Sequence, residues 1–177
     1  MATTKWAMDA AHSELLFKVR HMLVSNVSGQ FKSFDAAIET EDDDIATAKV
    51  SFSAEVASIT TNNEQRDGHL RSGDFFDTDN HPKLTFEGQG LSKVDDENYT
   101  MLGNLTMRGV TKPVKLKVEY GGIVTDPWGN TRTGFSISTK VNRKDYGVSF
   151  SMVSETGGIM LGEEVTINAN AEFVKTA

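Results

Sequence analysis

The sequence predicts an all-β protein folded as one eight-stranded antiparallel barrel with one or two short helices. Three observations support this fold class: apolar and polar residues alternate along nearly the whole chain, turn-rich connections separate the alternating segments, and each segment has a single apolar face. Short connections make consecutive strands antiparallel neighbours. A sheet with one apolar face can roll into a barrel, which removes its unpaired edges. A β-sandwich is the competing architecture.

Eight segments show the alternation expected of half-buried strands. They span residues 14–23, 30–40, 47–56, 83–92, 99–107, 114–124, 132–142 and 163–174. The sixth is the clearest, since Val114, Leu116 and Val118 alternate with charged residues. In the second, Phe31 breaks the alternation, which predicts a bulge or bend there. In the fourth, Gly88 continues the apolar face without a side chain, which either lets the strand coil sharply or opens space inside the barrel.

Residues 62–77 interrupt the strand pattern with a dense run of charged, glycine and aromatic residues. Asn63 suits an N-cap and Gly73 suits a C-terminal stop, so a short polar helix is predicted between them. A helix this short is not stable alone, so a neighbouring structure must hold it. We expect Phe75 and Phe76 to form an aromatic plug that docks the segment against the barrel.

Length and composition indicate a soluble globular protein with one domain over residues 1–177. The formal net charge of -7 argues against non-specific binding of nucleic acid. No apolar run approaches the roughly 20 residues that span a bilayer. The N-terminus lacks the apolar core of a signal peptide, so the chain as printed is expected to be cytoplasmic, or periplasmic if a leader has been removed. The absence of cysteine excludes disulfides, cysteine-bound zinc and thiol catalysis.

The inward faces of the predicted strands are apolar and are thinned by alanine and glycine, with His21 as the one clear ionisable exception. Eight strands enclose an interior that side chains either fill or leave open for one small ligand. Both interpretations, an apolar tunnel for an elongated molecule and a packed core, stay open at this point. The candidate lumen residues are Phe17, Val19, His21, Phe34, Ile38, Phe52, Val56, Leu84, Phe86, Met101, Leu105, Leu116, Val118, Phe135, Ile137 and Ile167.

A polar group is predicted at one mouth of the barrel, if the loops 57–82 and 143–162 meet there. The second of these loops is irregular and is another place for a short helix. The cluster could bind a phosphate or carbonyl head group, or it could clamp the two loops together, and the clamp is favoured. The candidate mouth residues are Arg66, Asp67, His69, Phe75, Phe76, Arg143 and Asp145.

The sequence offers little support for a metal site or a catalytic site. The four histidines, His12, His21, His69 and His81, contain no pair with the spacing of a helical zinc site. No Gly-x-Ser-x-Gly motif and no cysteine are present. We therefore predict no metal ligand and no catalytic residue.

A series of motifs in a fixed order covers nearly the full chain. They are Asp9-Ala-Ala-His12-Ser13, Phe17-Lys-Val19-Arg-His21, Ser25-Asn-Val27-Ser-Gly29-Gln-Phe31, Asn63-Glu-Gln-Arg66-Asp67-Gly-His69-Leu70-Arg-Ser-Gly-Asp74-Phe75-Phe76-Asp77 with Pro82 following, Gly103-Asn-Leu105-Thr106-Met-Arg-Gly109-Val-Thr111, Gly134-Phe135, Arg143-Lys-Asp145-Tyr146-Gly147 and Gly162-Glu-Glu-Val165. Together they resemble the YceI-like family of bacterial proteins, described as lipocalin-like, polyisoprenoid-binding barrels.

The resemblance implies an extended barrel that holds an isoprenoid chain, such as a quinone or polyprenyl lipid, in its lumen. It implies binding, sequestration or transport of this lipid partner, not turnover, with no cofactor other than the bound lipid. No nucleic acid or metal is expected as a partner, and a homodimer is left open. Two alternatives remain: an enzyme acting on a small apolar or isoprenoid substrate with His21 or His69 as general base, and a stress-related structural barrel with a filled core.

Overall fold

The computed structural model describes residues 2–21, 25–148 and 161–176, and it describes the side chains of all of these except His21 and Leu161. The strands are β1 (Thr3–Met8), β2 (Glu14–His21), β3 (Ser25–Phe31), β4 (Phe34–Glu41), β5 (Asp44–Glu55), β6 (Ile59–Thr60), β7 (Lys83–Gln89), β8 (Ser92–Lys93), β9 (Asn98–Met107), β10 (Val110–Thr125), β11 (Thr131–Asn142) and β12 (Leu161–Lys175). The helix is α1 (Glu64–Arg71), and the 3-10 turns are η1 (Ala10–His12), η2 (Val56–Ser58) and η3 (Arg143–Tyr146). In the part of the chain described, no helix has the length and apolar character needed to cross a membrane.

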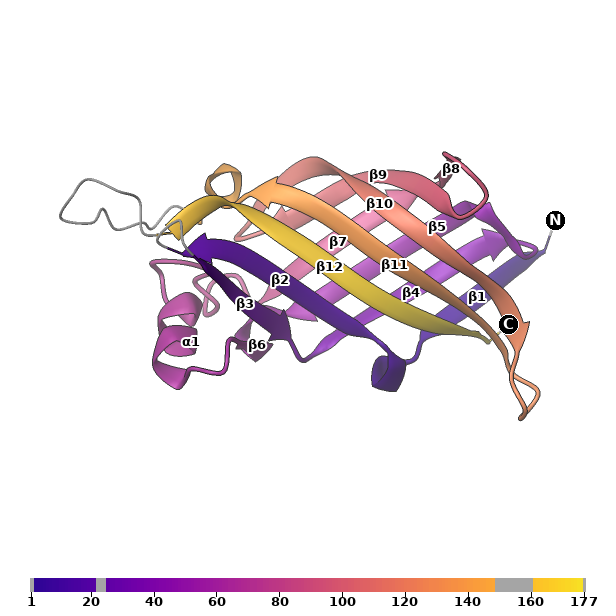
Figure 1. The fold of residues 1–177 in the computed structure, drawn as a ribbon, viewed down its shortest axis with the longest axis horizontal. Coiled ribbons are helices and arrows are strands. Elements are labelled where there is room, and N and C mark those ends of the chain that lie inside the picture. The colour runs from indigo at the N-terminus through magenta and orange to yellow at the C-terminus, as the bar shows by residue number, and fades with distance from the viewer. Residues whose placement is uncertain (1, 22–24, 149–160, 177) are drawn as a thin grey trace.

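The strands form a closed antiparallel barrel. Neighbours follow the order β1-β4-β5-β7-β9-β10-β11-β12, and β12 pairs back to β1. This closure gives eight positions around the barrel and confirms the predicted fold class over the sandwich. In Figure 1, the long strands run obliquely between an end that carries α1 and an end where both chain termini lie. We call these the α1 end and the terminal end.

Three neighbouring positions of the barrel are occupied by interrupted strands. β1 and β2 both pair with β12 and are separated by η1, while β5 and β6 are separated by η2. β3 and β4 are separated by a bend at residues 32–33, directly after Phe31. The predicted bend is therefore confirmed, but the predicted segment 30–40 is two strands. The sequence analysis also missed β1, in which Thr4 and Trp6 face the interior and are buried.

The predicted helix is present, with small differences at its end. The Asn63 side chain accepts a hydrogen bond from the Arg66 amide at 3.1 Å, as expected for an N-cap. The helix ends at Arg71 with Ser72 as its C-cap, shortly before the predicted stop at Gly73. In the second irregular region, η3 supplies a short 3-10 turn, and residues 149–160 lie outside the described residues.

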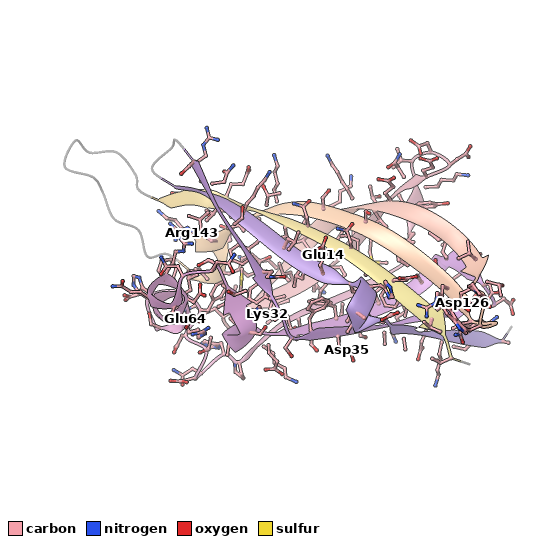
Figure 2. The ribbon with its side chains drawn as sticks, turned by 60° about the horizontal axis from the view of Figure 1, so that its bottom comes forward. Glu14, Lys32, Asp35, Glu64, Asp126 and Arg143 are labelled. Atoms are coloured by element: carbon pink, nitrogen blue, oxygen red, sulfur yellow. The ribbon has the colours of Figure 1, made fainter. Side chains whose placement is uncertain are left out.

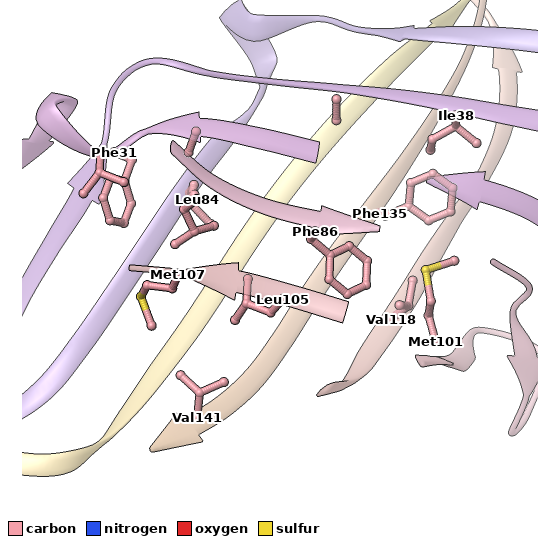
Figure 3. Close-up of a cluster of buried hydrophobic side chains, with 14 of the residues drawn as sticks. Phe31, Ile38, Leu84, Phe86, Met101, Leu105, Met107, Val118, Phe135 and Val141 are labelled. Carbon is pink, nitrogen blue, oxygen red and sulfur yellow. The ribbon is translucent and has the colours of Figure 1, made fainter. Parts of the chain in front are cut away.

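Part of the barrel interior is filled by side chains from β7 and β9 (Figure 3). Gly88 faces Gly103 across these two strands. A Cβ atom on Gly88 would lie 2.8 Å from the Met101 sulfur and 3.0 Å from the Phe86 ring. This glycine therefore makes room for neighbouring side chains, so the second of the two alternatives, that it leaves open space in the lumen, does not hold at this position.

Candidate functional site

A cavity of about 210 Å³ runs inside the barrel. Among the described residues, 36 are in contact with it, and of these only Glu14, Thr139 and Arg143 are polar. A compact cavity of this volume could not reach so many side chains, so the space is long and narrow. Its lining extends from Phe75, whose amide donates to the C-cap residue of α1, to Phe173, which pairs with Met8 of β1.

In part of the barrel, the inward side chains do not fill the space around its axis. Val165, Ile167, Ala169 and Ala171 all point inward from β12, yet each remains only partly buried. By contrast, inward residues of β7 and β9 are buried. The lumen is therefore packed along one wall and hollow along the opposite one, which supports the tunnel interpretation over a filled core.

All candidate lumen residues except His21 and Val56 line this cavity. The side chain of His21 lies outside the described part of the structure. Val56 is buried, at 1% exposure, but it does not line the cavity. The reason is that β5 ends at Glu55 and Val56 begins η2, so the alternation of the strand no longer applies to it. Sequence reasoning did not select Glu14 or Leu16, which lie on the outward face of β2 and still reach the cavity.

Of the candidate mouth residues, Phe75, Phe76 and Arg143 line the cavity. The ring of Phe76 packs edge-on against Phe31 at a centroid distance of 6.2 Å, so the expected aromatic plug is present. Asp145 is exposed on η3 and does not line the cavity.

Arg66 and Asp67 do not line the cavity either, because both side chains hold α1 against the segment after β6. Asp67 is 1% exposed and accepts hydrogen bonds from the amide and the hydroxyl of Thr61. Arg66 donates to the hydroxyl of Thr61 at 2.7 Å and to its carbonyl at 2.9 Å. These contacts match the clamp interpretation of the polar cluster.

Burial would raise the pKa of the Asp67 carboxyl, but hydrogen bonds from Thr61 and the charge of Arg71 outweigh burial and hold this pKa below its usual value. The carboxylate therefore stays ionised in the clamp. The ring of His69 pairs with Asp74 at 2.8 Å on the surface, and His69 does not line the cavity. This surface position does not support the alternative in which His69 acts as the general base of an enzyme.

Arg143 is part of the cavity wall at the α1 end, and main-chain carbonyls hold its guanidinium. It is 3% exposed, and it donates to the carbonyls of Gly162 and Val148, both at 2.8 Å. Burial lowers its pKa, and the nearby Glu163 carboxylate opposes that change. A guanidinium keeps its proton in proteins, so this cation persists beside an otherwise apolar space.

A second arginine, which sequence reasoning missed, ties the loops of the same end together. Arg108 donates to the carbonyl of Gly147 at 2.9 Å and to that of Gly73 at 3.0 Å. It lies in the tight β9–β10 turn with a positive φ of 52°, followed by Gly109. A tight connection was expected from the sequence at residues 108–113, but nothing in the sequence indicated that the Arg108 side chain would join two loops.

The terminal end is closed by packed side chains. Trp6 is 2% exposed and donates from its indole nitrogen to the hydroxyl of Thr40 at 3.2 Å. A chain of aromatic contacts crosses this end. It runs through Tyr99, Tyr120, Phe135 and Phe173 with ring centroids 5.5 to 6.1 Å apart.

An ion network lies outside the barrel wall near the same end. Asp9, His12 and Glu172 place ligand-type atoms within 4.8 Å of one another, a geometry that could hold a cation. Arg132 already supplies that positive charge, at 2.9 Å from Asp9 and 2.7 Å from Asp126. Hydrogen bonds from His12 and Arg132 lower the pKa of Asp9 to about 2, and Arg132 lowers the pKa of Asp126 to about 2.

Comparisons with known proteins agree with this architecture. The UPF0312 protein SA2479 of Staphylococcus aureus is 42% identical over 171 residues, which cover 96% of this chain and 97% of that protein. The YceI protein of Campylobacter jejuni has a similar structure, with a TM-score of 0.76 and 31% identity over 89% of this chain and 90% of that one.

Two more distant structures share the fold. Burkholderia cenocepacia BcnA gives a TM-score of 0.81 at 19% identity, over 93% of this chain and 98% of that chain. A polyisoprenoid binding domain from Saccharophagus degradans gives 0.71 at 15% identity, over 97% and 98% of the two chains. The model of the YceI-like domain matches residues 6–173. With the closed barrel, its motifs and this match over nearly the whole sequence, the chain belongs to the YceI-like family.

Proposed function

We propose that this protein binds the chain of an isoprenoid lipid, such as a quinone or polyprenyl compound, inside the barrel and sequesters or carries it without converting it. The observation that carries the proposal is the long cavity, whose wall contains three polar residues among those that the structure describes. The polyisoprenoid binding domain of Saccharophagus degradans shares this fold, which adds support at the level of architecture.

The binding energy would come mainly from the hydrocarbon tail. Burial of apolar surface contributes about 25 cal/mol per Å², so each additional isoprene unit held in the lumen strengthens binding without a polar contact. A branched tail suits a wall of Ile, Val, Leu and Phe side chains, since such a wall has no polar group to leave unpaired. The polar end of the lipid would lie near Arg143, whose charge suits a phosphate or a carbonyl oxygen.

The proposal can be tested first on protein purified from its native host. Organic extraction followed by mass spectrometry should release an isoprenoid lipid in a near-stoichiometric amount. Protein that is always empty, and that also fails to bind added quinone or polyprenol, would contradict the proposal.

A lumen-blocking variant sharpens the test. Ala169 points into the cavity from β12, so Ala169→Trp should place an indole in the path of the chain and weaken binding roughly tenfold or more. Ala46→Trp is the matched control, because Ala46 is exposed on the outer face of β5. Equal binding by both variants would mean that the lipid does not occupy the lumen.

A further inference from the structure

The cavity inside the barrel stops one layer of side chains short of the terminal end. On five strands, the last inward residue that lines the cavity is followed, two positions nearer to this end, by an inward residue that does not line it. Because these strands occupy positions on different sides of the closed ring, the cavity ends at one common level. From the lining residue to the next one, the pairs are Met8 and Trp6 on β1, Ile38 and Thr40 on β4, Met101 and Tyr99 on β9, Val118 and Tyr120 on β10, and Phe135 and Thr133 on β11. We call the five residues beyond this level, Trp6, Thr40, Tyr99, Tyr120 and Thr133, the floor layer.

The floor layer is packed, and hydrogen bonds hold its threonine hydroxyls in place. Trp6, Thr40 and Thr133 are all buried. The hydroxyl of Thr40 accepts from the Trp6 indole at 3.2 Å and donates to the carbonyl of Asp42 at 2.6 Å. The hydroxyl of Thr133 donates to the carbonyl of Gly122 at 2.9 Å. A hydrocarbon chain that passed through this layer would separate buried polar groups from their partners, which is unfavourable, so the layer forms a closed end.

A small residue lines the cavity next to the floor layer. Ala48 of β5 is buried and lines the cavity. Ile38 pairs with Val50, and Ala48 is the next inward residue of β5 towards the terminal end. In the closed ring, β5 lies four positions away from β11, so Ala48 and Phe135 belong to opposite walls. A larger side chain at residue 48 would therefore project into the end of the cavity that adjoins the floor layer.

We propose that the floor layer sets the greatest length of isoprenoid chain that the lumen can hold, with Trp6 as a residue that determines this length. The inference rests on the proposed function, because it needs a chain in the cavity. With the polar end of the lipid near Arg143, the tail runs towards the terminal end, where Asp126 lies in Figure 2. Each isoprene unit that enters the lumen strengthens binding, whereas a unit that the floor layer keeps outside adds nothing. Affinity should therefore rise with chain length and level off where the chain end meets the floor layer.

Two variants move the end of the cavity in opposite directions. Ala48→Leu adds carbon atoms next to the floor layer and should shorten the lumen. Trp6→Leu removes roughly the volume of one isoprene unit from the floor layer and should lengthen the lumen. Their matched controls are Ala46→Leu, on the exposed outer face of the same strand, and Trp128→Leu, on the exposed β10–β11 turn.

Affinities for prenyl alcohols of two, three, four, six and nine isoprene units are measured by displacement of a fluorescent polyene. In the unaltered protein, each added unit should strengthen binding at least about threefold up to a limiting length, and less than about twofold beyond it. Ala48→Leu should weaken binding of the alcohol of limiting length about tenfold and leave the two-unit alcohol unchanged. Trp6→Leu should strengthen binding of the next longer alcohol about tenfold, and both controls should keep the original limit.

The outcomes separate this inference from the proposed function. A gain in affinity that continues up to nine units overturns the role of the floor layer, and so does a limiting length that stays the same in Ala48→Leu and Trp6→Leu. A cooperative melting transition shows that a variant is folded, and either folded variant is enough for this comparison. If the unaltered protein binds none of the alcohols, the proposed function itself has failed.

Discussion

The two ends of the barrel are closed by different kinds of interaction. At the terminal end, Trp6 and a run of aromatic rings fill the interior, with Thr40 satisfying the one polar atom of the indole. At the α1 end, arginines hold loops in place by donating hydrogen bonds to main-chain carbonyls, as Arg108 and Arg143 do. Core packing is lost only when the whole protein unfolds, whereas loop hydrogen bonds can open locally. If the protein binds a lipid as proposed, the α1 end is therefore where we expect the head group to enter.

The largest expected effect tests the packed end. Trp6→Ala should lower the free energy of unfolding by about 3–5 kcal/mol, because it removes a large buried side chain and leaves a cavity. Trp128→Ala is the control, since Trp128 is 82% exposed on the β10–β11 turn and should change stability by less than about 0.5 kcal/mol. Denaturant unfolding measures both, and equal losses would show that the terminal end is not a packed closure.

The next effect tests the clamp at the α1 end. Asp67→Ala leaves the buried amide and hydroxyl of Thr61 without their acceptor, which should cost about 1–3 kcal/mol. Amide exchange should report this loss as faster local opening of α1, with the strands protected as before. Asp79→Ala, an exposed carboxylate in the following loop, should leave exchange in α1 unchanged. Loss of protection spread evenly over the barrel would contradict a local clamp.

A smaller effect is expected where one side chain joins two loops. Arg108→Asn removes the hydrogen bonds to Gly147 and Gly73, while asparagine tolerates the positive φ at this position. The expected cost is about 1 kcal/mol, since the substitution also removes Nε of Arg108, which is buried without a partner. Faster exchange near Gly73 and Gly147 would confirm the link. Lys112→Asn in β10, on the same hairpin, is exposed and should have no such effect.

The lumen and the α1 end also differ in how far the sequence could predict them. Alternation in a closed barrel fixes which side chains face inward, so nearly every candidate lumen residue lines the cavity. The prediction from alternation was wrong at Val56, where a 3-10 turn replaces the strand. The direction in which the Arg66 and Asp67 side chains point could not be predicted, because it depends on how α1 packs against Thr61.

Long-range pairing was the other feature beyond the reach of periodicity. Asp9 and Arg132 are 123 residues apart, and only the closure of the barrel between β1 and β12 brings them together. The interruptions of β1/β2 and of β3/β4 are of the same kind: they lie in neighbouring positions of the barrel, although each looks ordinary in the sequence.

The smallest effect is a dependence of stability on pH at the terminal end. Asp9 and Asp126 have folded-state pKa values of about 2, below the usual 3.8, because His12 and Arg132 bind the first carboxylate and Arg132 binds the second. Their contribution is therefore complete above about pH 4 and is lost as the pH falls from 4 towards 2. His12 acts in the opposite direction: Asp9 raises its pKa above 6.5, so its contribution is present below that pH and is lost as the pH rises through the raised value.

The variant Arg132→Gln separates this network from the rest of the barrel. Without the guanidinium, the melting temperature should be lower than in the original protein at pH 5 and should fall less steeply between pH 4 and pH 2. Lys140→Gln is the control, because Lys140 is exposed and faces only Glu164 at 3.8 Å. If both variants keep the same steep acid transition as the original protein, the network does not stabilise the terminal end, and packing around Trp6 alone closes it.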